Sequence, residues 1–179
     1  MKRTLLIAVV ASLLSVMPAR AKADDDEDVP SKRGPAVLVA FTAMYGVDGP
    51  FVGHNPIRGV HGDELPWEIK SAVGSLTSDG RLRIRVRGLV FKDDPSVPPE
   101  LRGINDEKEF RAVVSCLSES DDGTQVTTVN ITTGGFPSSR EGDSNIDAKV
   151  KLPKACVAPI VFVMSGKEDL WFSVTGAER

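Results

Sequence analysis

Residues 81–87 alternate without a break between arginine and branched apolar side chains. Leu82, Ile84 and Val86 occupy the apolar positions of this run. A period of two places successive side chains on opposite faces, which predicts a strand with one buried and one solvated face. The preceding Ser78-Asp79-Gly80 has the residues that a tight hairpin turn requires. This element therefore needs a second layer to cover its apolar face.

The rest of the chain repeats this pattern of short strands between Gly, Pro and Asp turns. Further runs with strand character cover residues 37–44, 67–76, 110–117, 124–132, 146–152, 157–164 and 170–175. The run 157–164 is continuously apolar, as expected of a strand that is buried on both faces. No stretch has sustained helical periodicity. About eight strands at this spacing predict an all-β fold, a single antiparallel β-sandwich that is immunoglobulin-like or similar.

The two cysteines, Cys116 and Cys156, lie 40 residues apart. An even pair in an exported chain predicts a disulfide. We expect the bridge to join two strands, as inter-sheet bridges do in immunoglobulin-like sandwiches. The alternative is a metal or redox pair, but there is no Cys-x-x-Cys motif and neither cysteine has a nearby histidine.

The first 23 residues have the layout of a secretory signal peptide. Lys2 and Arg3 precede an apolar run over 4–17, and two small-x-small cleavage sites follow at 19–21 and 21–23. The apolar run is shorter than the roughly 20 residues that span a bilayer. We therefore expect cleavage, no membrane span afterwards, and a periplasmic or extracellular location. An uncleaved anchor is the alternative.

The predicted mature chain begins with an acidic segment, residues 24–35, which we interpret as a disordered, solubilising tail. A loose calcium-binding patch is the alternative for its Asp and Glu residues. The predicted domain then covers residues 36–179. Loss of residues 1–23 removes four basic and no acidic residues, so the formal net charge changes from −3 to −7. Such a charge gives no electrostatic attraction to nucleic acid, and we expect no nucleic-acid partner.

The glycine- and proline-rich segment 45–66 contains both histidines of the chain. His54 and His61, together with Asp63 and Glu64, could supply nitrogen and oxygen ligands for zinc or another divalent metal. Their spacing matches no established ligand motif, so solvated loop histidines are the alternative. We expect no cofactor, with a divalent metal at this loop as the second hypothesis.

The arginines of the alternating strand form the second candidate site. Arg81, Arg83, Arg85 and Arg87 would lie roughly 7 Å apart on one face of a strand. Such a row could bind sulfate, phosphate or an acidic glycan through bidentate contacts. The alternative is an outer face that is paired with acidic side chains of neighbouring strands.

The sequence lacks motifs for a catalytic nucleophile or a phosphate loop, whereas paired carboxylates for glycoside hydrolysis carry no sequence motif and stay open. There is no Gly-x-Ser-x-Gly elbow, no Ser-x-x-Lys and no glycine-rich phosphate loop. Trp67, Trp171 and Phe172 start or lie within apolar strands, and we interpret them as core residues and not as a sugar-binding platform. We therefore assign no catalytic residue.

Several segments resemble small exported bacterial proteins of unknown function. The resemblance lies in Phe-Arg-Ala-Val-Val-Ser-Cys from residue 110, in Leu-Pro-x-x-Cys-x-Ala-Pro-Ile-Val-Phe-Val from 152, and in Trp-Phe-Ser-Val-Thr-Gly from 171. It also covers Leu-Pro-Trp at 65–67 and Arg-Val-Arg-Gly-Leu-Val at 85–90. It implies a bacterial, exported β domain, and it implies no activity or ligand.

These observations predict an exported, non-catalytic β-sandwich that serves as a binding or structural module of the bacterial envelope or exterior. Its partner would be a protein or a glycan. The second hypothesis is a metal-binding protein or metal-dependent enzyme that uses the 45–66 loop.

Overall fold

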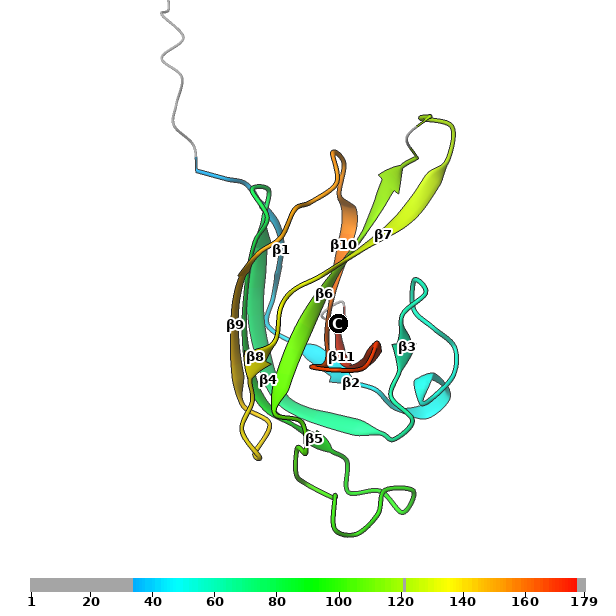
Figure 1. Ribbon diagram of the computed structural model, residues 1–179, viewed down its shortest axis with the longest axis vertical. Coiled ribbons are helices and arrows are strands. Elements are labelled where there is room, and N and C mark those ends of the chain that lie inside the picture. The colour runs from blue at the N-terminus through cyan, green and yellow to red at the C-terminus, as the bar shows by residue number, and fades with distance from the viewer. Residues whose placement is uncertain (1–33, 121, 177–179) are drawn as a thin grey trace, which may run out of the picture. The chain divides into compact units, whose positions relative to one another are not determined.

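Two sheets pack against each other in the computed structural model, which describes residues 34–120 and 122–176 (Figure 1). The first sheet has four strands in the order β1 (Val37–Phe41), β4 (Trp67–Thr77), β5 (Arg81–Phe91), β9 (Ser144–Lys149). The second has the order β2 (Met44–Gly46), β11 (Leu170–Thr175), β10 (Val157–Ser165), β6 (Glu109–Glu119), β7 (Val126–Thr132). Two short strands extend it, because β3 (His61–Gly62) pairs with β11 and β8 (Phe136–Pro137) pairs with β6.

This architecture is the predicted all-β sandwich. All pairings are antiparallel except that between β3 and β11. Three of the strands, β2, β3 and β8, are only two or three residues long, and the other eight match the predicted number. The predicted signal peptide and most of the predicted acidic tail, residues 24–33, lie outside the described residues. No helix in the described ranges has the length and apolar character needed to cross a membrane.

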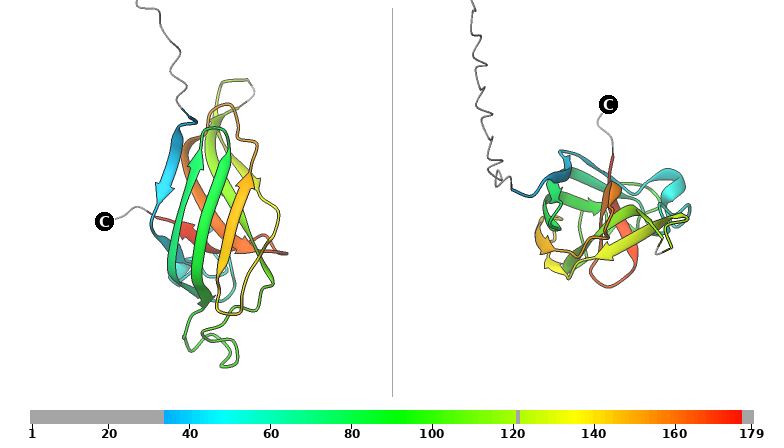
Figure 2. Two further views of the ribbon diagram at one scale, coloured as in Figure 1. Left: turned by 90° about the vertical axis from the view of Figure 1, so that its left-hand side faces the viewer. Right: turned by 90° about the horizontal axis from the view of Figure 1, so that it is seen from above.

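The hairpin of β4 and β5 is the longest pairing of the first sheet, and its face is visible in Figure 2. Gly80 turns the chain between the two strands with φ +84°. A Cβ at this position would lie 2.0 Å from the carbonyl oxygen of Val150, so both the turn and its contact with the segment after β9 require glycine. Along β5 the leucine, isoleucine and valine are buried while Arg81, Arg83 and Arg85 are exposed, as the alternation predicts.

The core between the sheets is built around Trp67. Its ring stacks on Phe172 with a centroid distance of 4.0 Å and contacts Phe91 at 4.1 Å. Phe110 meets the far side of this cluster by an edge contact with Phe172 at 5.9 Å. Trp67, Trp171 and Phe172 are all buried, which confirms their interpretation as core residues.

A second apolar layer lies between the second sheet and the segment 47–62. Phe51, in a short 3₁₀ helix (Gly49–Phe51), lies 6.2 Å from Trp171, and Trp171 lies 5.9 Å from Phe162 of β10. Val60 of the same segment is buried in this layer. The segment 45–66 is therefore not one loop, as its glycine and proline content predicts, because residues 47–62 form a cover that contains β3 and the 3₁₀ helix. Strand β10 is consequently buried on both faces over residues 161–165, as its apolar sequence predicts. The same prediction is wrong for residues 157–160, which are exposed or half-buried.

Cys116 and Cys156 form a disulfide, as predicted. The prediction that this bond joins the two sheets, as in immunoglobulin-like sandwiches, is wrong. Cys116 lies in β6, and Cys156 immediately precedes β10, which is the neighbour of β6 in the same sheet. The register between these strands shifts between Val157 and Ile160, where Ala158 has φ +44°. The disulfide thus joins two adjacent strands where their ladder is interrupted.

Candidate functional site

Strand β7 has a paired neighbour on one side only among the residues that the structure describes. Its sequence is Val-Thr-Thr-Val-Asn-Ile-Thr, without charge, proline or glycine. None of its side chains is fully buried, and Val126 is 71% exposed. In Figure 1 the hairpin of β6 and β7 extends away from the first sheet. The chain therefore presents seven uncharged residues along an open sheet edge, and all of them except Asn130 have high β propensity.

The hydrogen-bonding groups of this edge follow from the register with β6. Ser120 N–H donates to Gln125 O at 2.8 Å, and Thr133 N–H donates to Ala112 O at 2.9 Å. Bonded and non-bonded pairs alternate in an antiparallel ladder, so the odd-numbered residues of β7 bond to β6. The backbone N–H and C=O groups of the even-numbered residues point outward: Val126, Thr128, Asn130 and Thr132. No backbone partner for these groups is present within the described ranges.

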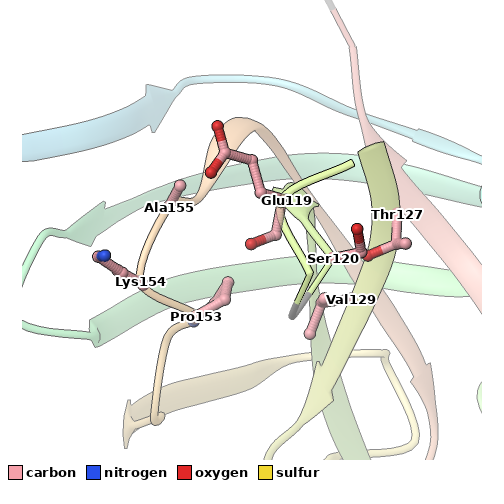
Figure 3. A pocket seen from close by; sticks show the side chains of 9 residues that line it. Glu119, Ser120, Thr127, Val129, Pro153, Lys154 and Ala155 are labelled. Atoms are coloured by element: carbon pink, nitrogen blue, oxygen red, sulfur yellow. The ribbon is translucent and has the colours of Figure 1, made fainter. Parts of the chain in front are cut away.

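A hollow of about 760 Å³ lies beside this hairpin (Figure 3). The hairpin contributes Glu119, Ser120, Thr127 and Val129 to its lining. The segment that precedes Cys156 contributes Pro153, Lys154 and Ala155. Glu119 and Lys154 point in different directions and form no ion pair in this part of the chain. Apolar side chains and hydroxyl groups therefore line the hollow together.

The tip of the hairpin is ordered by Asp122. Its carboxylate accepts hydrogen bonds from the hydroxyl groups of Ser120 and Thr124 and from the Thr124 N–H. The Ser120 bond is the main reason that the pKa of Asp122 falls to about 2. The ionised carboxylate therefore fixes the turn that leads into β7.

The predicted metal ligands do not gather around a common point. His54, His61 and Glu64 are exposed, whereas the Asp63 carboxylate accepts a hydrogen bond of 2.6 Å from the Trp67 indole N–H. Over residues 34–120 and 122–176, no group of three His, Cys, Asp or Glu side chains is placed to hold a metal ion. The structure therefore gives no support to the metal hypothesis, which stays a prediction.

Asp63 instead connects the 47–62 cover to the core. Burial raises the pKa of its carboxyl group, and the hydrogen bond from Trp67 opposes this rise. The Asp63 N–H also donates to Trp171 O, and its carbonyl accepts from the Gly53 N–H. Asp63 thus links β4, β11 and the cover segment, which is a structural role.

The predicted arginine row lies on the exposed face of the first sheet. Arg81 and Arg83 contact Asp147 of β9 at 2.8 and 3.4 Å, and Arg87 contacts Asp143 at 3.7 Å. Arg85 pairs in register with Asn145, and the described part of the chain offers it no ion-pair partner. This geometry favours the alternative of a paired outer face. Anion binding by the row stays a prediction.

We expect acid to destabilise the fold between about pH 4 and pH 2. The hydrogen bond from Lys149 is the main cause that lowers the pKa of Asp79 to about 2, and that from Arg81 lowers the pKa of Asp147. A depressed folded-state pKa stabilises the fold above the unfolded-state value of 3.8, and this stabilisation is lost as the pH falls through the folded-state value. Thermal melts at pH 5, 3.5 and 2.5 should therefore show a falling midpoint.

The matched variant for this prediction is Asp79→Asn, which keeps the size of the side chain and removes its titration. Its melting midpoint should fall less steeply between pH 4 and pH 2 than that of the wild-type protein. Parallel curves for the two proteins would contradict the assignment to Asp79.

No family model matches this chain, and no curated protein or solved structure gave a match to it.

Sequence reasoning predicted the strand at 124–132 but not its open edge. One signal in the sequence could have indicated it. Residues 126–132 lack any charged residue but contain three threonines and an asparagine, whereas the runs at 81–87 and 146–152 carry charged residues at alternate positions and the uncharged run at 157–164 is continuously apolar. The hollow residues Pro153 and Lys154 had no such signal, because only the non-local pairing of β6 with β10 brings them to the hairpin.

Proposed function

We propose that the protein is an exported, non-catalytic β-sandwich that binds polypeptide in the bacterial envelope or exterior. Its binding surface is the open edge of β7. The observation that carries this proposal is the row of outward backbone groups along an uncharged edge strand. An extended polypeptide can add to such an edge, where main-chain hydrogen bonds supply affinity and alternate side chains supply specificity.

The contrast with the other sheet edges supports this assignment. Exposed sheet edges are normally protected by charged residues, short length or irregularity, because their free backbone groups can pair with another chain. Strand β9 carries Asp147 and Lys149, β2 has three residues, and β1 has a register shift between Val37 and Val39. Strand β7 has none of these devices over its seven residues. An edge left open in this way is expected of a binding surface.

The disulfide supports both the location and the rigidity that the proposal needs. A disulfide persists in oxidising compartments such as the periplasm or the exterior. In β6, Cys116 pairs in register with Val129, the central residue of β7, and it is bonded to Cys156 beside β10. It therefore holds the hairpin to β10, so that the edge is presented as a preformed strand.

The proposal is tested with Thr128→Pro. Proline removes the outward N–H and fills the position that an added strand would occupy, and it breaks no bond to β6. The probe is a fluorescein-labelled peptide with the sequence of residues 125–133, followed by fluorescence anisotropy. We expect the wild-type protein to bind it and the variant to lose at least about tenfold in affinity, since tenfold corresponds to about 1.4 kcal/mol.

Two controls separate binding from folding. Thr128→Val replaces the side-chain hydroxyl with a methyl group, keeps the backbone N–H, and should bind the peptide as the wild-type protein does. A thermal melt should show that Thr128→Pro remains folded, whereas Val129→Pro loses a bond to β6 and should melt at a lower temperature. Equal peptide affinity of the wild-type protein and Thr128→Pro would contradict the proposal.

A further inference from the structure

We infer that the strand that occupies the β7 edge is β7 of a second copy of this chain. This inference rests on the proposed function and names the partner of the same surface. The two strands run antiparallel about a two-fold axis at Val129. Val126 then lies opposite Thr132 of the second copy, and Thr128 lies opposite Asn130.

This register uses every outward backbone group of the strand. About an axis at Val129, Val126 pairs with Thr132 and Thr128 pairs with Asn130. All four are outward residues, so every outward residue of one copy faces an outward residue of the other. Each opposed pair exchanges two hydrogen bonds in an antiparallel ladder. The two Val129 residues form the close, non-bonded pair at the axis, where apolar side chains approach one another most closely. The backbone match itself does not depend on the sequence of the added strand, so the charge and burial of β7 identify the partner.

The charges of the hairpin favour this arrangement. A two-fold axis places equivalent residues near each other, so a charged edge would bring like charges into contact. Strand β7 has no charged residue. Of the acidic residues in the described part of the hairpin, Asp122 lies in the turn at the tip, Glu119 ends β6 beside it, and Glu109 begins β6 at the opposite end. Antiparallel pairing separates the two tips by roughly 40 Å at about 3.4 Å per residue, whereas parallel pairing would place them side by side.

The half-buried residues on the inner face of β7 give the second copy apolar area to cover. Val129 and Ile131 pair in register with Cys116 and Val114, which belong to the core, yet both are only partly buried. Val129 also lines the hollow beside the hairpin. A second β7 continues the sheet past these side chains and covers them. The contact is a single strand pair, so the dimer should depend on protein concentration.

The test uses two double variants at the same positions and analytical ultracentrifugation of the purified protein. Thr128→Lys with Asn130→Lys places two like-charged pairs across the axis. Thr128→Lys with Asn130→Glu places two opposite-charged pairs there. Both variants lose the Asn130 side-chain bond to Arg58 O equally. We expect a concentration-dependent dimer for the wild-type protein and the lysine–glutamate variant, and a monomer for the lysine–lysine variant.

The outcomes separately test the β7 pairing, its register, the identity of the partner and the proposed function. A dimer that persists in the lysine–lysine variant overturns the β7 pairing, and loss of the dimer in both variants overturns the register. A wild-type protein that is monomeric at all concentrations but binds the 125–133 peptide overturns the second copy as partner and leaves the proposed function standing. A monomer that does not bind the peptide overturns both. Thermal melts of both variants establish that they are folded.

Discussion

Replacing Cys116 and Cys156 together with alanine is expected to lower the free energy of unfolding by roughly 4 kcal/mol. The bond closes a loop of 40 residues, and a cross-link of this span restricts the unfolded chain by about that amount. The double variant is preferable to either single one, because a single substitution leaves a free thiol. Urea denaturation of the wild-type and variant proteins measures the difference.

The disulfide should also have a local effect that its loop length does not predict. Between Val157 and Ile160 the ladder of β10 and β6 is interrupted, and the disulfide joins the strands at that point. Without it, amide hydrogen exchange should become faster in β7 and in residues 115–119 than in the hairpin of β4 and β5. Reduction of the wild-type protein should reproduce this pattern. A stability loss below about 1 kcal/mol with uniform exchange would contradict a clamping role.

The sequence predicted those parts of the fold that depend on local pattern. The alternation over 81–87 and the Ser78-Asp79-Gly80 turn identify the hairpin of β4 and β5 correctly, because side-chain period and turn conformation are properties of adjacent residues. The continuous apolar run at 157–164 correctly indicates burial for residues 161–164 but not for residues 157–160, which are exposed or half-buried. The sequence does not say that residues 47–62 supply one of those two covers. Their apolar residues have no period, and only packing against the second sheet defines their role.

In the candidate site, too, local sequence pattern predicted some features, whereas others depend on tertiary structure. Even cysteine content and predicted export indicate the disulfide, yet cysteine spacing carries no information on whether the two strands share a sheet. Strand character over 126–132 is readable from its valines, threonines and isoleucine. Its position at an edge is not, because an edge is defined by the absence of a pairing partner far away in the sequence. The histidines of segment 45–66 suggested a metal site because histidine is a common metal ligand. Their exposed positions depend on the tertiary packing of the cover, which the sequence does not indicate.

Trp67→Ala is expected to cost about 3–5 kcal/mol of stability, the range for removal of a large aromatic side chain from a packed core. Trp67 is 2% exposed and contacts both Phe172 and Phe91. Its indole N–H also holds Asp63 and therefore the 47–62 cover. Urea denaturation measures the loss. A cost below about 2 kcal/mol would contradict the central position of this residue in the core.

Trp67→Phe separates the indole hydrogen bond from the ring. Phenylalanine keeps an aromatic group in the cluster but leaves the Asp63 carboxylate without its donor. Burial already raises the pKa of Asp63, and the lost bond was lowering it, so its pKa rises further in the variant. A carboxyl group with a raised folded-state pKa destabilises the fold once the pH exceeds the unfolded-state value near 3.8, and the full penalty applies above the folded-state value. The stability difference between Trp67→Phe and the wild-type protein should therefore be larger at pH 7 than at pH 4. Adding Asp63→Asn to both proteins should remove this pH dependence, and a difference that stays pH-dependent in that background would show that another group causes it.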